Sequence, residues 1–456
     1  MSETMTWFAP DRTAADPAEL PTLAPAGPPA VASAAPVLSV GSPATARLLL
    51  ADAWLSLVGP AVPAGGPGAG LTESAIAHLA RLGPRPPGTR ALVDLVERVG
   101  LTGHGGAHGP VALKWRAVLR GTGPLTLVAN GAESEPVSAK DGTLMRQRPH
   151  LVLDGMALAA EALGARRVVV WLHGDDDGAR AAIEHALAER RHLPGADLPV
   201  EVVSGPSHYL SGESNAIARA IAGGPALPTL RRFPGPGEPS TVVQNVETLA
   251  RLALVARGLV PTTVLATVLT PTGRRVVEVE RTVRVADLLT GVGWSLGPPP
   301  QAVLVGGYGG TWIAWSQVAD LRMDPEDFRA AGFALGAGVV VPLPPGACGV
   351  TETAAMTAYL ASMSAHQCGP CLFGLPALAG SLELLASGRA PAGELARLHA
   401  DVRAVEGRGA CRHPDGATRL IASAVGVFAD HLADHAEGRP CQSVPRSVFP
   451  MPQEQR

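Results

Sequence analysis

The chain has 456 residues, of which 46% are hydrophobic, and a formal net charge of -3 at pH 7. This length allows about two to four domains with cores of their own, and the lack of a basic block argues against a nucleic-acid partner. We find no secretory leader and no apolar run of the ~18 residues that a membrane span needs, so we expect a cytoplasmic protein without direct membrane insertion.

Proline- and glycine-rich tracts interrupt the first part of the chain. Residues 1 to about 43 are rich in Ala, Pro and Ser, a composition typical of a disordered leader. A helix is possible over 44–58, and short helices are predicted over 72–82 and 92–99. We therefore assign 1–90 to a largely disordered or short-helical leader.

A glycine-rich stretch follows and reads Gly100-Leu-Thr-Gly-His-Gly-Gly-Ala-His-Gly-Pro-Val-Ala-Leu-Lys-Trp115. Glycines let backbone N–H groups approach an anion, and Lys114 adds a positive charge. After an apolar run comes Asn130-Gly-Ala-Glu-Ser-Glu-Pro136, which places polar groups at the carboxyl end of a strand, where open α/β sheets bind ligands. Both stretches indicate a site for a phosphate-bearing cofactor.

Residue usage supports this interpretation. Lys114 and Lys140 are the only lysines in a chain that otherwise uses arginine, and Asn130, Asn215 and Asn245 are the only asparagines. Lysines that survive such a bias beside glycine-rich or acidic motifs are interpreted as chemically required. Two leftover surface lysines that lie close together by chance are the alternative.

From 91 to 258 the pattern alternates strands and helices. Strands are predicted over 125–129, 168–172 and 198–203, with helices over 156–163 and 179–190. Such a βαβ series predicts a doubly wound α/β sheet.

The remainder divides into a mixed region and a helical region. A small α+β domain is predicted over 259–330, with strands at 263–269, 275–280 and 302–305, a helix at 285–289, and a glycine turn that closes a hairpin at 306–310. Helices over 352–365, 373–387, 392–405 and 417–436 predict a bundle within 331–440, followed by a tail over 441–456.

All five cysteines lie in the last quarter of the chain, a spread unlike that of a disulfide framework. Cys368-Gly-Pro-Cys371 matches a redox dithiol, but it follows a helix-like segment rather than a strand. With Cys411 it instead suggests a metal centre, and we favour an iron–sulfur site. A structural zinc with His366 or His413 is the further alternative. We interpret Cys348 and Cys441 as ordinary core or surface residues.

Together, these motifs resemble a known family. The glycine stretch, Asn130 to Asp141, Tyr209-x-Ser-Gly-Glu213, Gln244-Asn-Val-Glu-Thr-Leu249 and the late cysteines occur in the order found in the NADH-binding flavoprotein subunit of respiratory complex I and its relatives in hydrogenases and formate dehydrogenases. The resemblance implies a Rossmann-like FMN-binding domain (91–258), a ubiquitin-like SLBB domain (259–330) and a helical iron–sulfur binding domain (331–440).

The resemblance also implies the cofactor contacts. FMN would be held by its phosphate and ribityl chain, with NADH stacked over the flavin and Glu135 near the NADH. No catalytic side chain is required, because hydride passes to the flavin, which then releases single electrons to a cluster. The other implied cofactor-binding residues are Gly103, Gly105, Gly106 and Lys114 at the phosphate, with Asn130, Glu133, Tyr209, Gly212, Glu213, Gln244, Asn245 and Thr248 around the rest of the FMN.

Several positions depart from the family pattern. His104 replaces an arginine, Gly109 an aromatic residue, and Ala132 a carboxylate. Ala365 stands where the first of four cluster cysteines is expected. The implied metal ligands are therefore Cys368, Cys371 and Cys411, with His366 as the nearest non-cysteine ligand, for a 4Fe-4S or 3Fe-4S cluster.

The expected function is thus that of an NADH dehydrogenase-like oxidoreductase. Electrons would pass from NAD(P)H or a redox protein through FMN to the cluster and then to an acceptor protein or partner subunits. The alternatives are a non-catalytic assembly or scaffold subunit with eroded cofactor sites and a dithiol redox protein that uses the Cys-Gly-Pro-Cys motif.

Overall fold

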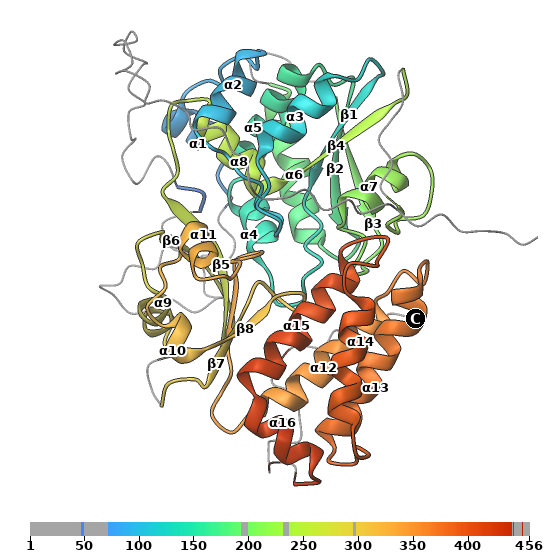
Figure 1. Cartoon of the computed structure of the whole chain (residues 1–456). Coiled ribbons are helices and arrows are strands. Elements are labelled where there is room, and N and C mark those ends of the chain that lie inside the picture. The colour runs from blue at the N-terminus through green and yellow to red at the C-terminus, as the bar shows by residue number, and fades with distance from the viewer. Residues whose placement is uncertain are drawn as a thin grey trace, which may run out of the picture. The chain divides into compact units, whose positions relative to one another are not determined.

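The computed structural model describes residues 47–49, 72–192, 199–230, 237–294, 298–439, 441 and 449 (Figure 1). The predicted leader over 1–43 lies outside these residues, as does most of the possible helix over 44–58. Residues 47–49 form a bend, and the N–H groups of Leu48 and Leu49 donate to the carboxylate of Glu278 at 2.9–3.1 Å.

The first sheet has four parallel strands: β1 (Leu125–Asn130), β2 (Arg167–His173), β3 (Val200–Gly205) and β4 (Ser240–Asn245). Their order is β3-β2-β1-β4, which is the order of the first four strands in a doubly wound Rossmann-type sheet. The predicted α/β fold class is therefore confirmed.

Eight helices accompany this sheet in the described chain. They are α1 (Ala75–Leu82), α2 (Ala91–Arg98), α3 (Val111–Leu119), α4 (Lys140–Gln147), α5 (Pro149–Leu163), α6 (Asp177–Arg190), α7 (Ser214–Ile221) and α8 (Val246–Val255). The helix predicted over 156–163 begins earlier, at Pro149, since proline is well tolerated in the first turn of a helix. Periodicity does not predict α3, α4, α7 or α8.

Side chains on β1 alternate between two separate cores. Leu127 and Ala129 belong to the large core that includes α5 and α8, whereas Val128 faces Ile217 of α7 on the other side of the sheet. Both faces of the strand are covered, which explains its nearly continuous apolar sequence.

The second sheet is mixed and contains β5 (Thr263–Thr270), β6 (Gly273–Glu280), β7 (Ala302–Val305), β8 (Thr311–Ala314) and β9 (Val339–Pro342) in the order β6-β5-β9-β7-β8. Helices α9 (Val285–Gly291), α10 (Trp315–Val318) and α11 (Pro325–Ala330) accompany it. The predicted glycine turn joins the antiparallel pair β7 and β8. Because β9 pairs with both β5 and β7, the sheet continues beyond the predicted boundary at residue 330. The domain boundaries themselves stay predictions.

The C-terminal bundle contains α12 (Gly349–Ser362), a π-helical turn (Pro370–Gly374), α13 (Leu375–Ala386), α14 (Glu394–Val405), α15 (His413–Val427) and α16 (Ala429–Ala436). The single helix predicted over 417–436 is wrong, because Phe428 leaves helical geometry at φ -111° and ψ 30° and separates α15 from α16. Its buried ring packs edge-on against Trp312, with 5.2 Å between the ring centres, and this tertiary contact outweighs the helical pattern.

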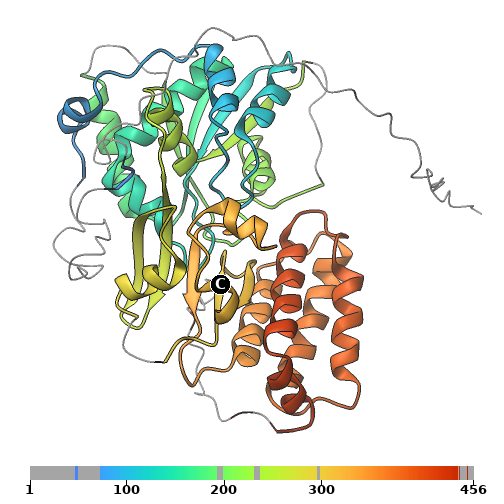
Figure 2. The same ribbon diagram turned by 60° about the vertical axis from the view of Figure 1, so that its left-hand side comes forward.

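The second sheet packs on both faces. Val303, Val305 and Val340 lie in the core that contains α9, whereas Leu304 and Val341 lie in the core of the bundle. Figure 2 shows these yellow and orange strands beside the orange and red helices of the bundle. Among the described residues, no helix is long and apolar enough to cross a membrane.

We predict that Gly155→Ala destabilises the protein by about 1–3 kcal/mol through overpacking. A Cβ atom at Gly155 in α5 would lie 1.8 Å from the carbonyl oxygen of Leu249 in α8, so these buried helices would have to separate. The matched control is Gly426→Ala in α15, where a Cβ atom meets nothing within 4 Å and helix propensity favours alanine by roughly 0.5–1 kcal/mol. Chemical denaturation of the two variants measures both changes, and equal stabilities would contradict the packing argument.

Candidate functional site

A buried ion cluster lies beneath the glycine-rich stretch. The Lys140 Nζ donates to Asp141 Oδ1 at 2.8 Å, to Glu247 Oε2 at 2.7 Å and to the backbone oxygen of His104 at 3.1 Å. Burial opposes the charge on Lys140, but the carboxylates of Asp141 and Glu247 outweigh burial and raise the pKa of the ammonium group. This lysine therefore joins the glycine-rich stretch to the starts of α4 and α8.

Three predicted cofactor-binding residues also act as helix caps. The Glu133 carboxylate accepts the N–H groups of Asp141 and Gly142 at the start of α4. Glu213 is the N-cap of α7 and Asn245 is the N-cap of α8. These helix N-termini follow the carboxyl ends of strands, where their dipoles favour an anionic ligand, although the caps already satisfy part of that capacity.

The glycine-rich stretch is held against the start of α8. The backbone N–H of His104 donates to Thr248 Oγ1 at 2.9 Å, and a Cβ atom at Gly105 would lie 3.4 Å from the Cβ of Asn245. Gly106 has φ 98°, a conformation that glycine adopts without strain. Gly103 closes the stretch by donating its N–H to the Gly109 oxygen at 2.9 Å.

His108 also has a positive φ, 46°, which is uncommon for a residue with a side chain. Its Nε2 donates to the backbone oxygen of Gly336 at 2.7 Å and ties the glycine-rich stretch to a loop that precedes β9. This bond offsets the conformational cost of the positive φ at His108.

The remaining predicted FMN contacts lie at the carboxyl edge of the first sheet. The Lys114 Nζ donates to the Val243 oxygen in β4 at 2.9 Å. Asn130 donates its Nδ2 to the Gly212 oxygen at 2.9 Å. A Cβ atom at Gly212 would lie only 2.4 Å from Ser134 Oγ, so glycine is required for the close approach of the two loops.

Four buried polar atoms around this edge have no hydrogen-bond partner among the described residues: His104 Nδ1, His108 Nδ1, Glu135 Oε1 and Gln244 Oε1. A buried polar atom without a partner carries a desolvation penalty, so such a group of atoms favours the binding of a ligand or water. The donor and acceptor set therefore fits a polar cofactor such as FMN. The individual contacts remain predictions.

Glu135 lies where the three predicted domains meet. Its Oε2 accepts the Tyr209 hydroxyl at 3.3 Å and the Tyr308 N–H at 3.0 Å. A Cβ atom at Gly307 would collide with the Glu135 carboxyl carbon at 2.3 Å, so the hairpin turn passes directly over this carboxyl group. Burial raises the pKa of Glu135 to about 8, which outweighs the bonds that favour its ionised form.

The three tyrosines of the chain surround this carboxyl group. The Tyr359 ring, from α12, lies edge-on to those of Tyr209 and Tyr308, with ring centres 6.0 and 5.8 Å apart. Sequence reasoning identifies only Tyr209. The rarity of tyrosine, like that of lysine, is the signal that could have identified Tyr308 and Tyr359.

The three thiols proposed as cluster ligands interact electrostatically. Burial, followed by the neighbouring thiol of Cys368, raises the pKa of Cys371 to about 12, and Cys411 adds to the effect. The Ala365 backbone N–H is close enough to the Cys371 sulfur to favour its thiolate, so Ala365 lies near the thiols. A metal centre binds cysteines as thiolates and displaces their protons, so a cationic centre would offset the effect of burial on Cys371.

The two candidate histidines are placed differently. His413 is buried, its Nε2 donates to the Leu360 oxygen at 2.7 Å, and burial lowers its pKa to about 4. His366 is exposed with φ 51°, and its Nδ1 lies 3.4 Å from Ser364 Oγ. His413 thus uses its Nε2 to support the end of α12, and the assignment of His366 as a ligand remains a prediction.

The residues predicted to bind the flavin lie close to the thiols predicted to bind the cluster. The ring of Tyr209 lies against that of His413, with 5.5 Å between centres, and His413 follows Cys411 by two residues. Burial is the main cause of the raised pKa of Cys411, and Glu213 is one of the charges that raise it further. The N-cap of α7 is therefore within electrostatic reach of a cluster thiol.

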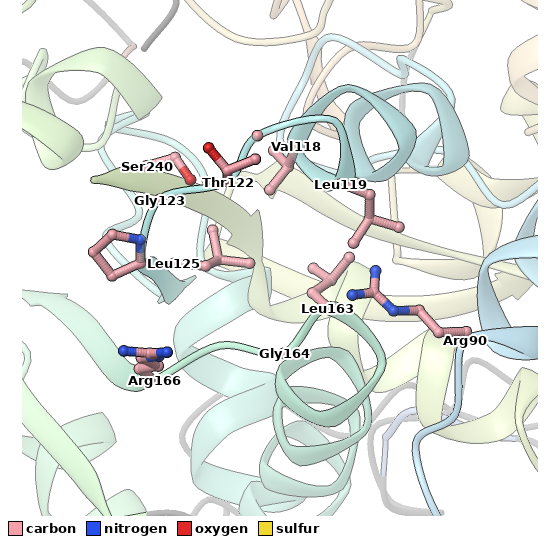
Figure 3. Close-up of a pocket in the computed structure, with 12 residues that line it drawn as sticks. Arg90, Val118, Leu119, Thr122, Gly123, Leu125, Leu163, Gly164, Arg166 and Ser240 are labelled. Atoms are coloured by element: carbon pink, nitrogen blue, oxygen red, sulfur yellow. The ribbon is translucent and has the colours of Figure 1, made fainter. Parts of the chain in front are cut away.

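A pocket of about 280 Å³ lies elsewhere, at the amino ends of the parallel strands. Figure 3 shows Arg90 and Arg166 on two sides of this hollow, with Leu125 and Ser240 from the starts of β1 and β4. None of the predicted site residues lines it, which is consistent with ligand binding at the opposite edge of such sheets.

Two known protein families match the regions that contain the predicted flavin-binding residues and the predicted cluster ligands. Residues 96–254 match the family described as the Nuo51 FMN-binding domain, and residues 351–435 match the iron–sulfur binding region of NADH-ubiquinone oxidoreductase F. The chain is 29% identical over 379 residues to the F 2 subunit of the NADH-quinone oxidoreductase of Rhizobium meliloti, covering 77% of this chain and 90% of that protein.

Hydrogenase subunits are also similar. The chain is 25% identical to the HndC subunit of the NADP-reducing hydrogenase of Solidesulfovibrio fructosivorans, covering 77% of each protein. A crystal structure of an NAD+-reducing [NiFe]-hydrogenase in the H2-reduced state matches with a TM-score of 0.67 and 26% identity over 77% of this chain. The chain spans only 63% of the length of that hydrogenase chain.

We predict that Glu135→Gln makes the fold less sensitive to pH. The folded-state pKa of Glu135 is raised from 4.5 to about 8, so the protonated carboxyl stabilises the fold fully below pH 4.5, and this contribution is lost as pH rises to about 8. The variant should therefore gain stability relative to the unaltered protein across this interval, by more than about 1 kcal/mol.

Denaturation midpoints between pH 5 and 8.5 measure this difference. The exposed Glu406→Gln variant serves as the control and should run parallel to the unaltered protein. A constant difference between Glu135→Gln and the unaltered protein over the whole range would refute the raised pKa.

Proposed function

We propose that the chain is an oxidoreductase subunit that passes electrons from a nicotinamide dinucleotide through FMN to an iron–sulfur cluster. The matches to the Nuo51 FMN-binding domain and to the iron–sulfur binding region of NADH-ubiquinone oxidoreductase F support this proposal, as does the similarity to an NADH-quinone oxidoreductase F subunit. The observation that carries this proposal is the proximity of the predicted flavin residues to the thiols, seen in the contact of Tyr209 with His413 and the effect of Glu213 on Cys411.

The FMN would be held at the carboxyl edge of the first sheet. The glycine-rich stretch would approach the phosphate with its backbone N–H groups, and Lys114 would supply a positive charge from α3. Gln244 Oε1 and His104 Nδ1 are buried and have no hydrogen-bond partner among the described residues, and each would bond to the FMN. When bound, FMN accepts a hydride and releases electrons one at a time.

The cluster would be held by Cys368, Cys371 and Cys411. Three thiolates suit a 3Fe-4S cluster, or a 4Fe-4S cluster with His366 or another ligand in the fourth place. Positively charged iron would favour thiolates that burial otherwise disfavours.

The acceptor is proposed to be a partner subunit that docks beside the cluster. Leu372 and Phe373 directly follow Cys371 and are 46% and 76% exposed, so they offer an apolar surface next to a cluster ligand. The relatives are named as subunits of larger enzymes, which supports assembly with other chains. We also propose that the protein functions in the cytoplasm.

An assembly subunit without catalysis is the second candidate. Glu133, Glu213 and Asn245 bond to helix N-termini, so these predicted flavin contacts also have a structural function. A scaffold protein could therefore keep these residues for the stability of the helices even if it bound no cofactor.

We predict that anaerobically purified protein carries FMN and iron–sulfur absorption that NADH bleaches, and that Lys114→Ala weakens FMN binding. Loss of one charge-assisted contact should raise the FMN dissociation constant by about tenfold or more. The control is Arg120→Ala, which removes an exposed charge at the other end of the same helix.

Absorption spectra, released flavin and total iron would be measured together. Bleaching by dithionite but not by NADH would indicate a redox protein as the electron donor. A colourless protein that stays colourless after reconstitution with FMN, iron and sulfide would reject the proposal in favour of a scaffold.

We further predict that Ala365→Cys stabilises a four-iron cluster. Its backbone N–H is close enough to the Cys371 sulfur to lower the pKa of that thiol, so a thiol at position 365 would lie near the existing three. The variant should hold more iron per chain and lose it more slowly in air, whereas Ala331→Cys, an exposed control in the second domain, should change neither. Iron content and electron paramagnetic resonance of the reduced protein measure this effect, and unchanged iron retention in Ala365→Cys would contradict the assigned site.

A further inference from the structure

The structure brings together two cysteines and a histidine that lie far apart in the sequence and outside the cluster site. Cys348 is the N-cap of α12, His435 lies near the end of α16, and Cys441 follows α16. Within the described part of the chain, the two sulfur atoms and a ring nitrogen of His435 all lie within 4.8 Å of one another. From this arrangement we propose that Cys348, His435 and Cys441 bind a divalent zinc-type metal ion.

The distances fit tetrahedral zinc. The His435 Nε2 lies 3.6 Å from Cys348 Sγ and 3.4 Å from Cys441 Sγ. Bonds of about 2.3 Å to sulfur and about 2.0–2.1 Å to nitrogen, at a tetrahedral angle, place the two ligand atoms about 3.6 Å apart. The histidine nitrogen therefore lies at close to the tetrahedral spacing from both sulfur atoms, and the two sulfur atoms lie within 4.8 Å of each other.

The histidine is oriented as a metal ligand. Its Nδ1 lies 3.2 Å from the Leu385 oxygen and 3.1 Å from the Ala386 oxygen. Because carbonyl oxygens only accept hydrogen bonds, Nδ1 carries the proton, and the lone pair of Nε2 faces the two sulfur atoms. A second bond of this kind fixes the tautomer and ring orientation of most histidines that bind metals.

Without a metal, the Nε2 lone pair accepts the backbone N–H of Cys441 at 3.3 Å. A bond from Nε2 to a metal ion would replace this long hydrogen bond. Cys348 and His435 are each only 1% exposed, whereas Cys441 is exposed. The site thus has two buried ligands and one ligand at the solvent side, where water could complete the coordination.

The site is separate from the cluster thiols. Cys368 and Cys371 precede α13, whereas the two carbonyls that orient His435 belong to its last residues. The 12 residues of α13 span roughly 18 Å. A metal here would link the start of α12 and the end of α16 to Cys441, which follows α16.

Two thiolates and an imidazole favour zinc among the common divalent metals, since magnesium and calcium prefer oxygen ligands. The ligands lose their thiol protons on binding, so binding releases protons and strengthens with pH. The inferred role is structural, because the residues lie outside the proposed electron-transfer path.

The test uses full-length protein with both Cys368 and Cys371 replaced by Ser, so that the cluster thiols cannot form a competing dithiolate site. The metal-free, reduced chain is titrated with Co²⁺, which reports thiolate ligands by charge-transfer absorption and tetrahedral geometry by its visible bands, and then with Zn²⁺ as competitor. One equivalent of Co²⁺ with both signatures, displaced by Zn²⁺, is expected.

The ligand variants decide the assignment. Cys441→Ser, at an exposed position that should not disturb folding, and His435→Gln should each weaken Co²⁺ binding at least tenfold and abolish the rise in melting temperature that Zn²⁺ produces. The exposed His399→Gln in α14 is the matched control and should behave as its parent. Unchanged Co²⁺ binding in Cys441→Ser, or a Cys348–Cys441 disulfide that persists in reductant, would overturn the proposal.

Discussion

The buried ion pair of Lys140 with Glu247 is the interaction on which the cofactor edge of the first sheet depends. It joins the starts of α4 and α8 and holds the glycine-rich stretch through the His104 oxygen. A buried charge is costly unless its partners compensate it, and removal of one partner from such a pair typically costs about 3–5 kcal/mol. The same contacts that stabilise this part of the fold therefore also position the backbone that would approach a phosphate.

The helix caps combine structural and binding positions in the same way. Glu133, Glu213 and Asn245 each satisfy helix N–H groups and are also among the residues predicted to contact the flavin. A substitution at such a residue would alter helix stability and cofactor binding together. Loss of flavin after mutation therefore needs a stability measurement beside it before either role is assigned.

Glu135 performs a similar function between domains. The hairpin turn of the second sheet closes over its carboxyl group, and tyrosines from three regions of the chain surround it. A carboxyl group with a pKa of about 8 is largely neutral at pH 7 and can be buried there at a modest cost. The junction thus couples the packing of the three predicted domains to one protonation state.

The sequence alone determined the α/β class of the first sheet and the presence of a C-terminal helical bundle, because apolar periodicity is a local property. Resemblance to a known family supplied the order of the cofactor motifs. The sequence also indicated Lys140 through its rarity. Tertiary structure decided the rest. Cys348 and Cys441, which local sequence context marks as ordinary, meet at His435 only because α12, α13 and α16 pack together. The break at Phe428 and the closure over Glu135 likewise depend on contacts between residues far apart in the chain, which no local pattern encodes.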